Sequence, residues 1–235
     1  MGADFFQFKR FTIRQQHCAQ KVGTLACLLG ALCQHYAPEK ILDIGTGTGL
    51  LALMLAQRYD DAQIQAIEID EATCKQAKEN FTSSLWAARL QAIHDDLLKF
   101  APTHPFDIII SNPPFFTAHM PASHQKTNMA RHDATLRKED ILIFAKKWLH
   151  QNGLLWILLP PRESEEIEKM APRFDLQLYR RYQIYIRKDL PLKACITCFG
   201  RNLKKPVFQD IVVHENHTIY TSEFIDLLQD YYLHL

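Results

Sequence analysis

A glycine-rich turn between an expected strand and an expected helix constrains the fold of this chain more than any other feature. The turn is Gly45-Thr-Gly-Thr-Gly49, with glycine at every second position. Residues 40–45 before it predict a strand, and residues 50–58 after it predict an apolar helix. Glycine lets such a turn bend tightly and lets a ligand touch the backbone. Together these segments predict the first unit of a nucleotide-binding α/β fold.

Strand-like and helix-like segments alternate along the rest of the chain. Short apolar or β-branched runs predict further strands at residues 64–69, 90–94, 106–110, 154–159, 176–186, 193–199 and 207–213. Apolar or amphipathic stretches predict further helices at residues 71–81, 137–150, 163–170 and 221–233. Asn152-Gly153 indicates a helix stop before the strand at 154. This alternation predicts an α/β domain with a mostly parallel sheet.

The length and composition fit one globular unit. The 235 residues, 47% hydrophobic and 23% charged, can bury one sizeable core. We expect a single domain over 1–235, with an amino-terminal arm and helix (1–36), a core (37–200) and a carboxyl-terminal strand and helix (201–235). The net charge of +1 argues neither for nor against a nucleic-acid partner. Without a signal peptide, a membrane span or a cysteine framework, the sequence predicts a cytoplasmic protein, away from membranes and without an obligate protein partner.

Residues 106–116, Phe-Asp-Ile-Ile-Ile-Ser-Asn-Pro-Pro-Phe-Phe, begin as a buried strand and stop abruptly. Pro113 and Pro114 cannot donate to a sheet ladder, and Pro113 keeps Asn112 out of helical geometry. An amide and two aromatic rings therefore stand at a strand end, where open α/β sheets bind ligands. An ordinary strand-to-loop turn would use the same residues, so this stretch alone leaves both interpretations open.

Acidic residues follow the second and third expected strands. Glu68 comes 19 residues after Gly49, close to the spacing of about 20 expected for an acid that binds a ribose. Asp96 ends the third strand. Leu50 occupies the place of the third small residue of a dinucleotide fingerprint, and no G-x-x-x-x-G-K-[ST] motif is present, so both NAD and ATP are disfavoured.

The glycine turn with Asp43, the two acids and Asn112-Pro-Pro-Phe115 together resemble the class I S-adenosylmethionine-dependent methyltransferases. The Asn-Pro-Pro-Phe element is similar to the branch that methylates amide or exocyclic amine nitrogens. Both ends of the chain, at residues 8–31 and 220–233, resemble the bacterial tRNA1(Val) (adenine-37-N6)-methyltransferase family. The resemblance implies a Rossmann-like fold whose mostly parallel, seven-stranded sheet carries helices on both faces.

The resemblance also implies S-adenosylmethionine as the cofactor, tRNA as the partner and the N6 amine of an adenine as the methyl acceptor. It implies these cofactor-binding residues: Asp43, Gly45, Gly47, Gly49, Glu68 and Asp96. The side chain of Asn112 and the carbonyl of Pro113 would accept the amine N–H groups, and Phe115 would stack on the base. Neither a general base nor a metal is required.

Basic residues suggest where RNA could bind. Arg180, Arg181, Arg187 and Lys188 alternate with tyrosines near the end of the chain, and Arg131 lies in a long polar loop. The same residues could form an ordinary solvated surface. The Cys195-Ile-Thr-Cys198 spacing occurs in redox sites, but it falls in a strand-like run, so we expect neither a redox nor a metal site.

Other substrates remain open at this point. A protein-glutamine N5-methyltransferase, or an adenine-N6 methyltransferase acting on DNA or rRNA, would present a planar N–H₂ group to the same Asn-Pro-Pro-aromatic loop. The short amino-terminal segment disfavours the glutamine substrate, because it leaves no room for a separate recognition domain. From a different class, a non-catalytic RNA-binding module could keep the cofactor fold, although the full set of glycines, acids and Asn112 argues against it.

Overall fold

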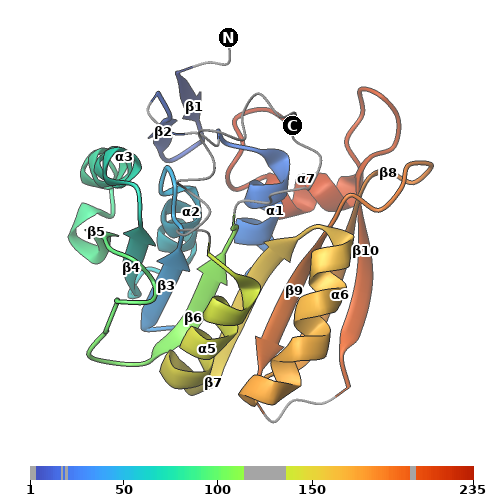
Figure 1. Ribbon diagram of the computed structural model, residues 1–235. Helices are drawn as coiled ribbons and strands as arrows, with labels where there is room; N and C mark the ends of the chain where they lie inside the picture. Colours follow the sequence, from blue (N-terminus) through green and yellow to red (C-terminus); the bar gives the residue numbers. More distant parts are fainter. Residues whose placement is uncertain (1–3, 17, 19–20, 114–135, 202–204) are drawn as a thin grey trace, which may run out of the picture.

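The computed structural model describes residues 4–235, except for 17, 19–20, 114–135 and 202–204. The central element of this part of the chain is an eight-stranded sheet, which Figure 1 shows. Its strands, in spatial order, are β10 (Val207–His214), β8 (Gln177–Arg187), β9 (Ala194–Gly200), β7 (Leu149–Leu159), β6 (Phe106–Ser111), β3 (Lys40–Ile44), β4 (Gln63–Glu68) and β5 (Leu90–His94). Among these eight, β9 alone runs antiparallel to its neighbours. The carboxyl ends of the other seven strands therefore lie at one edge of the sheet.

Helices cover both faces of the sheet (Figure 1). One face packs against α1 (Thr24–Leu32), α2 (Leu50–Arg58), α3 (Glu71–Thr82) and α7 (Ser222–Leu228). The other packs against α5 (Lys138–Trp148) and α6 (Pro161–Met170). The central strands are buried on both sides, which explains their continuous apolar sequence. Within the described residues, none of the helices combines the length and apolar composition that a membrane span requires.

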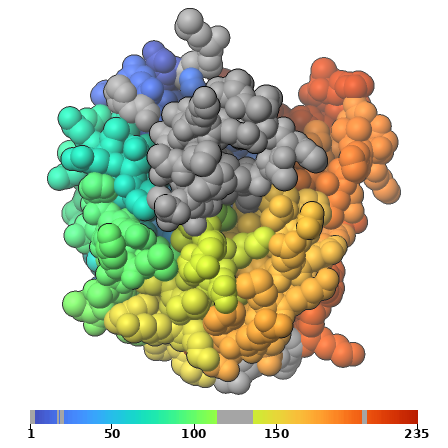
Figure 2. All heavy atoms as spheres, in the orientation of Figure 1, coloured from blue at the N-terminus to red at the C-terminus, as the bar shows by residue number. Residues whose placement is uncertain are grey.

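Shorter elements complete the fold. The 3-10 turn η1 (Ala87–Arg89) precedes β5, and η4 (Ala171–Phe174) precedes β8. A separate two-stranded hairpin, β1 (Phe5–Gln7) and β2 (Thr12–Arg14), stands near the amino terminus. The space-filling view shows these amino-terminal residues in blue beside α3 in teal (Figure 2).

The sheet has one strand more than the family resemblance predicted. The run at 207–213 does form a strand, as expected, and β10 pairs in parallel with β8 from Val207 opposite Arg180 to His214 opposite Arg187. A seven-stranded sheet would leave the edge of β8 open, whereas β10 satisfies its backbone hydrogen-bonding groups. The mostly parallel Rossmann-like architecture is confirmed, and the strand count is corrected from seven to eight.

The boundary between α5 and β7 also differs from the prediction. Helix α5 ends at Trp148 and β7 begins at Leu149, so Asn152-Gly153 lies inside the strand and does not stop a helix. The glycine is needed for a different reason. A Cβ atom at Gly153 would lie 2.8 Å from the backbone oxygen of Phe106, where the register between β6 and β7 shifts. Close backbone approach at an irregular pairing is a common use of glycine within strands.

The closing helix is shorter than predicted. Helix α7 ends at Leu228, not at 233. The backbone beyond it pairs with the amino-terminal segment instead, because the Lys9 amide donates to the Tyr231 oxygen at 2.8 Å and Phe8 forms a bridge with Tyr232. The two ends of the chain are therefore joined by backbone hydrogen bonds.

The Gly153→Ala substitution should destabilise the fold by about 1–3 kcal/mol, the usual effect of overpacking, because backbone opposes the added carbon. Urea unfolding measures the change. Gly23→Ala is the matched control, since a Cβ there would have its nearest neighbour, the Lys21 oxygen, at 4.0 Å. Equal unfolding free energies for the two variants would contradict the packing argument.

Candidate cofactor and catalytic site at the carboxyl edge of the sheet

The structure brings the predicted site residues to the ends of four adjacent strands. In spatial order, β6 ends just before Asn112, β3 leads into the glycine loop, β4 ends at Glu68 and β5 leads into Asp95-Asp96. All four strands are parallel, so these ends share one edge. This is where open α/β sheets bind ligands.

The glycine loop follows the end of β4 through backbone hydrogen bonds. The amides of Gly45 and Thr46 both donate to the Ile67 oxygen, at 2.9 and 3.0 Å. Gly45, Gly47 and Gly49 have φ values of 67°, 57° and 86°, a region that other residues rarely adopt. Beside Gly45 and Gly47 an added Cβ would meet no described atom within 4 Å, so this side of the loop is open enough for a ligand to approach.

Asp43 is buried beneath this loop. Its Oδ2 accepts a hydrogen bond from the Thr46 hydroxyl at 2.6 Å, whereas its Oδ1 meets no donor in hydrogen-bond geometry among the described residues. Burial raises the pKa of Asp43 to about 7, although the Thr46 hydroxyl and the nearby Ala52 amide act in the opposite direction. A buried acceptor without a partner is costly, so this carboxyl suits a ligand that brings a cation or a donor.

Glu68 links the glycine loop to the start of α3. Its Oε2 accepts from the Gly47 amide at 3.0 Å, and its Oε1 accepts from the Asp70 amide at 3.1 Å. Because each carboxylate oxygen accepts one of these bonds, the orientation of the Glu68 carboxylate is fixed. Each carboxylate oxygen still has lone-pair capacity for a further donor, such as a hydroxyl group.

Asp95 and Asp96 have different surroundings. Asp95 has a structural role, because its amide donates to the Glu68 oxygen at 3.1 Å and its Oδ1 accepts from the Asp96 amide at 2.8 Å. Asp96 accepts from the Leu98 amide through Oδ1 at 3.0 Å. The ends of β4 and β5 are thus held together, with the Asp96 carboxylate at the same edge as Glu68.

Asn112 stands at the end of β6 with an unused acceptor. The Ser111 hydroxyl donates to the Ile44 oxygen at 2.9 Å and fixes the end of β6 against β3. The next side chain, Asn112, has a buried Oδ1 without a hydrogen-bond partner among the described residues, and Pro113 is buried. Leaving such an oxygen unpaired costs about 1–3 kcal/mol, which binding of an N–H donor would offset. Phe115 lies outside the described residues.

Two neighbours of the site carry no sequence motif and were not predicted. Asn80 on α3 is 2% exposed; its Oδ1 accepts from the Arg14 amide at 3.0 Å, and its Nδ2 donates to the oxygens of Arg14 and Thr48, both at 2.9 Å. Cys18 lies near Glu68, where burial and that carboxylate raise the pKa of the thiol to about 11. The segment before α1 therefore reaches the cofactor side of the sheet, which no local pattern could reveal.

The structure separates the basic residues that were predicted to contact RNA. Successive strand residues face opposite sides, so Arg180 and Arg181 on β8 cannot share one patch. Arg181 pairs with Glu168 at 3.4 Å on the face that α6 covers. At the carboxyl end of β8, Arg187 pairs with Asp189 at 2.7 Å and Lys188 is exposed.

These two residues lie three strand spacings from β6, each roughly 4.8 Å. Arg131 lies outside the described residues. The roles of all five basic residues in RNA binding stay predictions.

Within the described residues, the two cysteines and the other potential metal ligands form no second centre. Cys195 contacts Arg181 on the α6 face, with Nη2 to Sγ at 3.5 Å, whereas Cys198 lies in the core on the α1 and α2 face. The odd spacing on a strand therefore points the two thiols in opposite directions. Across the described part of the chain, no three His, Cys, Asp or Glu side chains gather in a way that could hold a metal ion.

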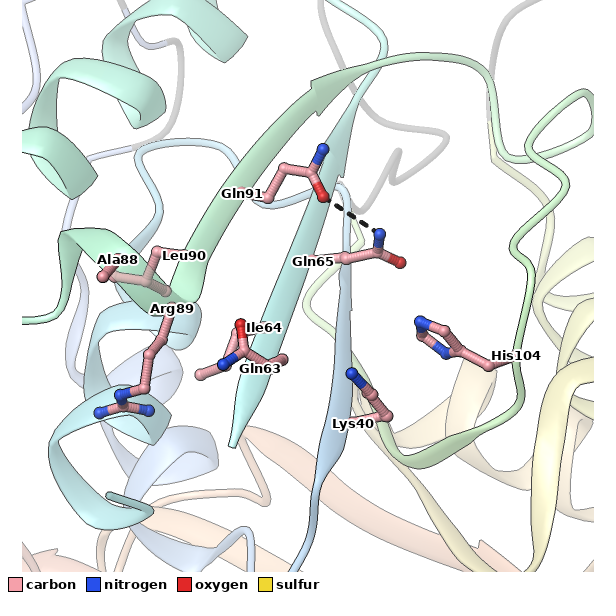
Figure 3. A pocket seen from close by; sticks show the side chains of 9 residues that line it. All are labelled: Lys40, Gln63, Ile64, Gln65, Ala88, Arg89, Leu90, Gln91 and His104. Atoms are coloured by element: carbon pink, nitrogen blue, oxygen red, sulfur yellow. Dashed lines mark hydrogen bonds between the residues drawn. The ribbon is translucent and has the colours of Figure 1, made fainter. Parts of the chain in front are cut away.

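A pocket of about 420 Å³ lies at the opposite edge of the sheet (Figure 3). Its lining comes from the first residues of three strands, including Lys40, Gln63 and Leu90, together with His104 before β6. The amide of Gln65 donates to Gln91 at 3.2 Å across this pocket. It is separated from Glu68 and Asp96 by the length of the strands and is not part of the candidate site.

Known proteins with similar sequences are methyltransferases. Residues 18–170 match the family described as methyltransferase small domain. The tRNA1(Val) (adenine(37)-N6)-methyltransferase of Bacteroides thetaiotaomicron is 37% identical over 236 residues, which cover 100% of both chains. The chain belongs to the tRNA1(Val) (adenine(37)-N6)-methyltransferase family.

Solved structures support the fold of this family member. A protein described as a predicted O-methyltransferase from Agrobacterium tumefaciens superposes with a TM-score of 0.65 at 18% identity, over 87% of this chain and 95% of that chain. A TehB-like S-adenosylmethionine-dependent methyltransferase from Corynebacterium glutamicum gives 0.52 at 18%, over 78% and 90%. At these identities the likeness concerns the fold alone.

S-adenosylmethionine is the cofactor of this class of methyltransferases, and the residues at the carboxyl edge fit it. The cofactor carries cationic groups and ribose hydroxyls. The edge offers the Asp43 oxygen that has no partner among the described residues, the lone pairs of Glu68 and a loop with open space beside Gly45 and Gly47. Acceptors thus predominate where a cation with several donors would bind.

The titration of Asp43 should make the stability of the cofactor-free protein fall between about pH 4 and pH 7. The pKa of Asp43 is about 7 in the folded protein, above the value of about 3.9 for an unfolded chain. The folded state therefore holds a proton that the unfolded state has released, and its stability falls as the pH rises through this window. Asp43→Asn cannot titrate, so it should lose less stability, by an amount on the order of a few kcal/mol.

Urea unfolding at the two ends of this pH window measures the difference. Asp60→Asn changes an exposed aspartate and serves as the matched control, which should follow the wild-type profile. If the profiles of wild type and Asp43→Asn run parallel, the buried carboxyl does not have the role assigned to it.

Proposed function

We propose that this protein transfers a methyl group from S-adenosylmethionine to the N6 amine of adenine 37 in tRNA1(Val). The observation that carries this proposal is the buried Oδ1 of Asn112, which has no hydrogen-bond partner among the described residues and stands beside the strand ends that fit the cofactor. The 37% identity to a named tRNA1(Val) (adenine(37)-N6)-methyltransferase along the full length supports the choice of substrate. With tRNA as its partner, the protein would act in the cytoplasm.

Each cofactor-binding residue would hold a different part of the ligand. When bound, S-adenosylmethionine supplies a methyl group that is activated by a cationic sulfur. The glycine loop would lie along the methionine portion, and Asp43 would accept from its ammonium group. Glu68 would accept from the ribose hydroxyls, and Asp96 from the adenine amine. Hydrogen bonds to charged groups contribute about 1.5–3 kcal/mol each.

Asn112 and Pro113 would prepare the target amine. The lone pair of an adenine amine is delocalised into the ring, so the amine is a poor nucleophile. If the Asn112 side chain and the Pro113 carbonyl accept its two N–H bonds, the lone pair faces the methyl group and the developing positive charge is stabilised. Positioning the two reactants can contribute much of the roughly 7–11 kcal/mol available from proximity.

The target base must also leave its stack. In RNA, adenine is stacked between neighbouring bases, and enzymes that modify a base extrude it into a pocket. Phe115 is our proposed stacking partner for the extruded adenine, at about 1–3 kcal/mol per base. This interaction would offset part of the cost of unstacking.

Incubation of the protein with labelled S-adenosylmethionine and total tRNA from a strain that lacks the gene tests the substrate. Mass spectrometry of mapped fragments should find N6-methyladenosine at position 37 of tRNA1(Val). Parallel reactions with rRNA, DNA and a glutamine-containing protein test the other acceptors. Methyl transfer to one of those alone, or tight RNA binding without any transfer, would overturn the proposal.

Asn112→Ala should lower kcat by about 10²–10³, the usual loss when a preorganised polar group at a reacting centre is removed. The Kd for S-adenosylmethionine should stay close to the wild-type value, because Asn112 contacts the substrate amine and not the cofactor. Calorimetry beside a labelled-methyl assay measures both. Asn152→Ala, at an exposed asparagine in β7 near the opposite edge, is the matched control. Near-normal turnover in Asn112→Ala would refute the role.

Glu68→Ala should raise the Kd for S-adenosylmethionine by at least about tenfold, since a charged hydrogen bond contributes about 1.5–3 kcal/mol. The variant also removes the acceptor of the Gly47 amide and so loosens the loop. Glu71→Ala changes an exposed acid in the first turn of α3 and should leave the Kd nearly unchanged. An unaltered Kd in Glu68→Ala would rule out the ribose assignment.

A further inference from the structure

The amino-terminal hairpin is held against the cofactor edge of the sheet. Asn80 binds both the amide and the oxygen of Arg14 on β2, and the same side chain donates to the Thr48 oxygen in the glycine loop. Buried hydrogen bonds to backbone on two segments fix their separation. In Figure 1 the hairpin stands above α2 and α3, at the side of the sheet where β3 and β4 end.

Aromatic packing secures the inner face of the hairpin. The register pairs Phe6 with Ile13, and Ile13 is fully buried. In the following turn Phe8 stacks on Phe11 with ring centroids 4.5 Å apart, and Phe11 meets the edge of Trp86 at 5.9 Å. The hairpin is therefore anchored to the rest of the fold by a buried aromatic cluster.

The outer face of the hairpin presents an aromatic ring beside a guanidinium. Strand alternation places Phe5, Gln7, Thr12 and Arg14 on this face, and all four are exposed. Phe5 and Arg14 are direct cross-strand partners, so their Cβ atoms lie about 4.5–5.5 Å apart. Phe5 is 55% exposed, an unusual place for a phenylalanine on a short strand.

The hairpin is also locally basic in a chain that is almost neutral. Residues 4–16 contain three cations, Lys9, Arg10 and Arg14, against one acid, Asp4, whereas the whole chain has 27 basic and 26 acidic residues. Arg10 lies over the Trp86 ring at 5.4 Å. Within the described residues, the guanidinium groups of Arg10 and Arg14 make neither a hydrogen bond nor an ion pair, so their donors are available to a ligand.

We propose that the outer face of the β1–β2 hairpin binds the RNA substrate, with Phe5 stacked on an unpaired base and Arg14 bound to an adjacent phosphate. Single-stranded RNA is recognised by aromatic stacking together with cationic contacts to the backbone. A protein partner is less well matched, because the apolar part of this face is one ring flanked by the polar Gln7 and Thr12. The proposal rests on the proposed tRNA substrate.

The Asn80 side chain links this surface to the glycine loop. Because Arg14 and Thr48 share one buried side chain, an RNA segment held on the hairpin is held in register with the glycine loop. The extruded adenine could then reach Asn112 while its neighbours stay bound outside. The hairpin thus contributes to the choice of substrate, and the strand ends contribute the chemistry.

Phe5→Ala and Arg14→Ala in the full-length protein test the proposal. Each should raise the Kd for labelled tRNA roughly tenfold, in the range for the loss of one stacked base or one phosphate contact. The KM for tRNA should rise in parallel, whereas kcat at saturating tRNA and the Kd for S-adenosylmethionine should not change. Arg14→Ala keeps the backbone bonds to Asn80, so the thermal midpoint should also remain close to wild type.

Salt dependence distinguishes a phosphate contact from a structural effect. In a plot of log K against log salt, Arg14→Ala should lower the slope by about 0.7–0.9, the contribution of one neutralised phosphate, whereas Phe5→Ala should keep the wild-type slope. Arg14→Lys keeps the charge and should keep the slope. Arg14→Glu should weaken tRNA binding more than Arg14→Ala, a result that does not depend on packing.

Matched controls come from the opposite edge of the sheet. Tyr36→Ala removes an aromatic ring that is 95% exposed before β3, and Arg173→Ala removes an exposed arginine from η4. Both should bind and methylate tRNA as the wild type does. If Phe5→Ala and Arg14→Ala also match the wild type in tRNA Kd and KM, the hairpin proposal falls while the tRNA function stands. If the wild type itself neither binds nor methylates tRNA, both proposals fall.

Discussion

The glycine loop after β3 is held by the backbone of β4, and the rest of the site depends on this contact. The amides of Gly45 and Thr46 share the Ile67 oxygen, and the Gly47 amide binds the Glu68 carboxylate. A chain with side chains at 45 and 47 could hardly adopt these positive φ angles. The loop therefore turns without covering the strand ends, and it leaves its own backbone accessible beside Glu68. Gly49, with a φ of 86°, completes the turn directly before helix α2 starts at Leu50.

At the carboxyl edge of the sheet, tightly packed strand ends lie next to polar atoms that have no partner among the described residues. The strands β3 and β6 are almost completely buried, and Ser111 ties their ends together. Directly beside this rigid base, Asp43 and Asn112 each have one buried oxygen that meets no hydrogen-bond partner among the described residues. Folding alone gains nothing from such atoms, since each costs about 1–3 kcal/mol. The proposed ligands would supply the missing donors, and the rigid strands hold the two oxygens in position for them.

The amino-terminal hairpin lies beside the candidate site, outside the Rossmann-like core. Asn80 holds it to the glycine loop, Tyr231 holds it to the end of the chain, and aromatic rings fill the space beneath it. This arrangement explains why residues far apart in sequence meet at one edge. The RNA surface proposed on this hairpin differs from the one that the basic residues at 180–188 suggested. Successive residues of β8 alternate between the two faces of the sheet, so Arg180 and Arg181 lie on opposite faces.

Local sequence patterns determined most of the secondary structure of this protein and indicated the residues of its candidate site. Buried strands, the positive-φ glycines and the acids that follow strand ends leave local signals, so the positions of Asp43, Glu68, Asp96 and Asn112 at one edge could be predicted. The pairing of β10 with β8, the start of β7 at Leu149 and the hydrogen bonds of Asn80 to remote backbone were decided only by the tertiary structure. Each of these depends on which distant backbone lies alongside, and strand pairing and buried side-chain bonds between remote segments leave no period or motif in the sequence.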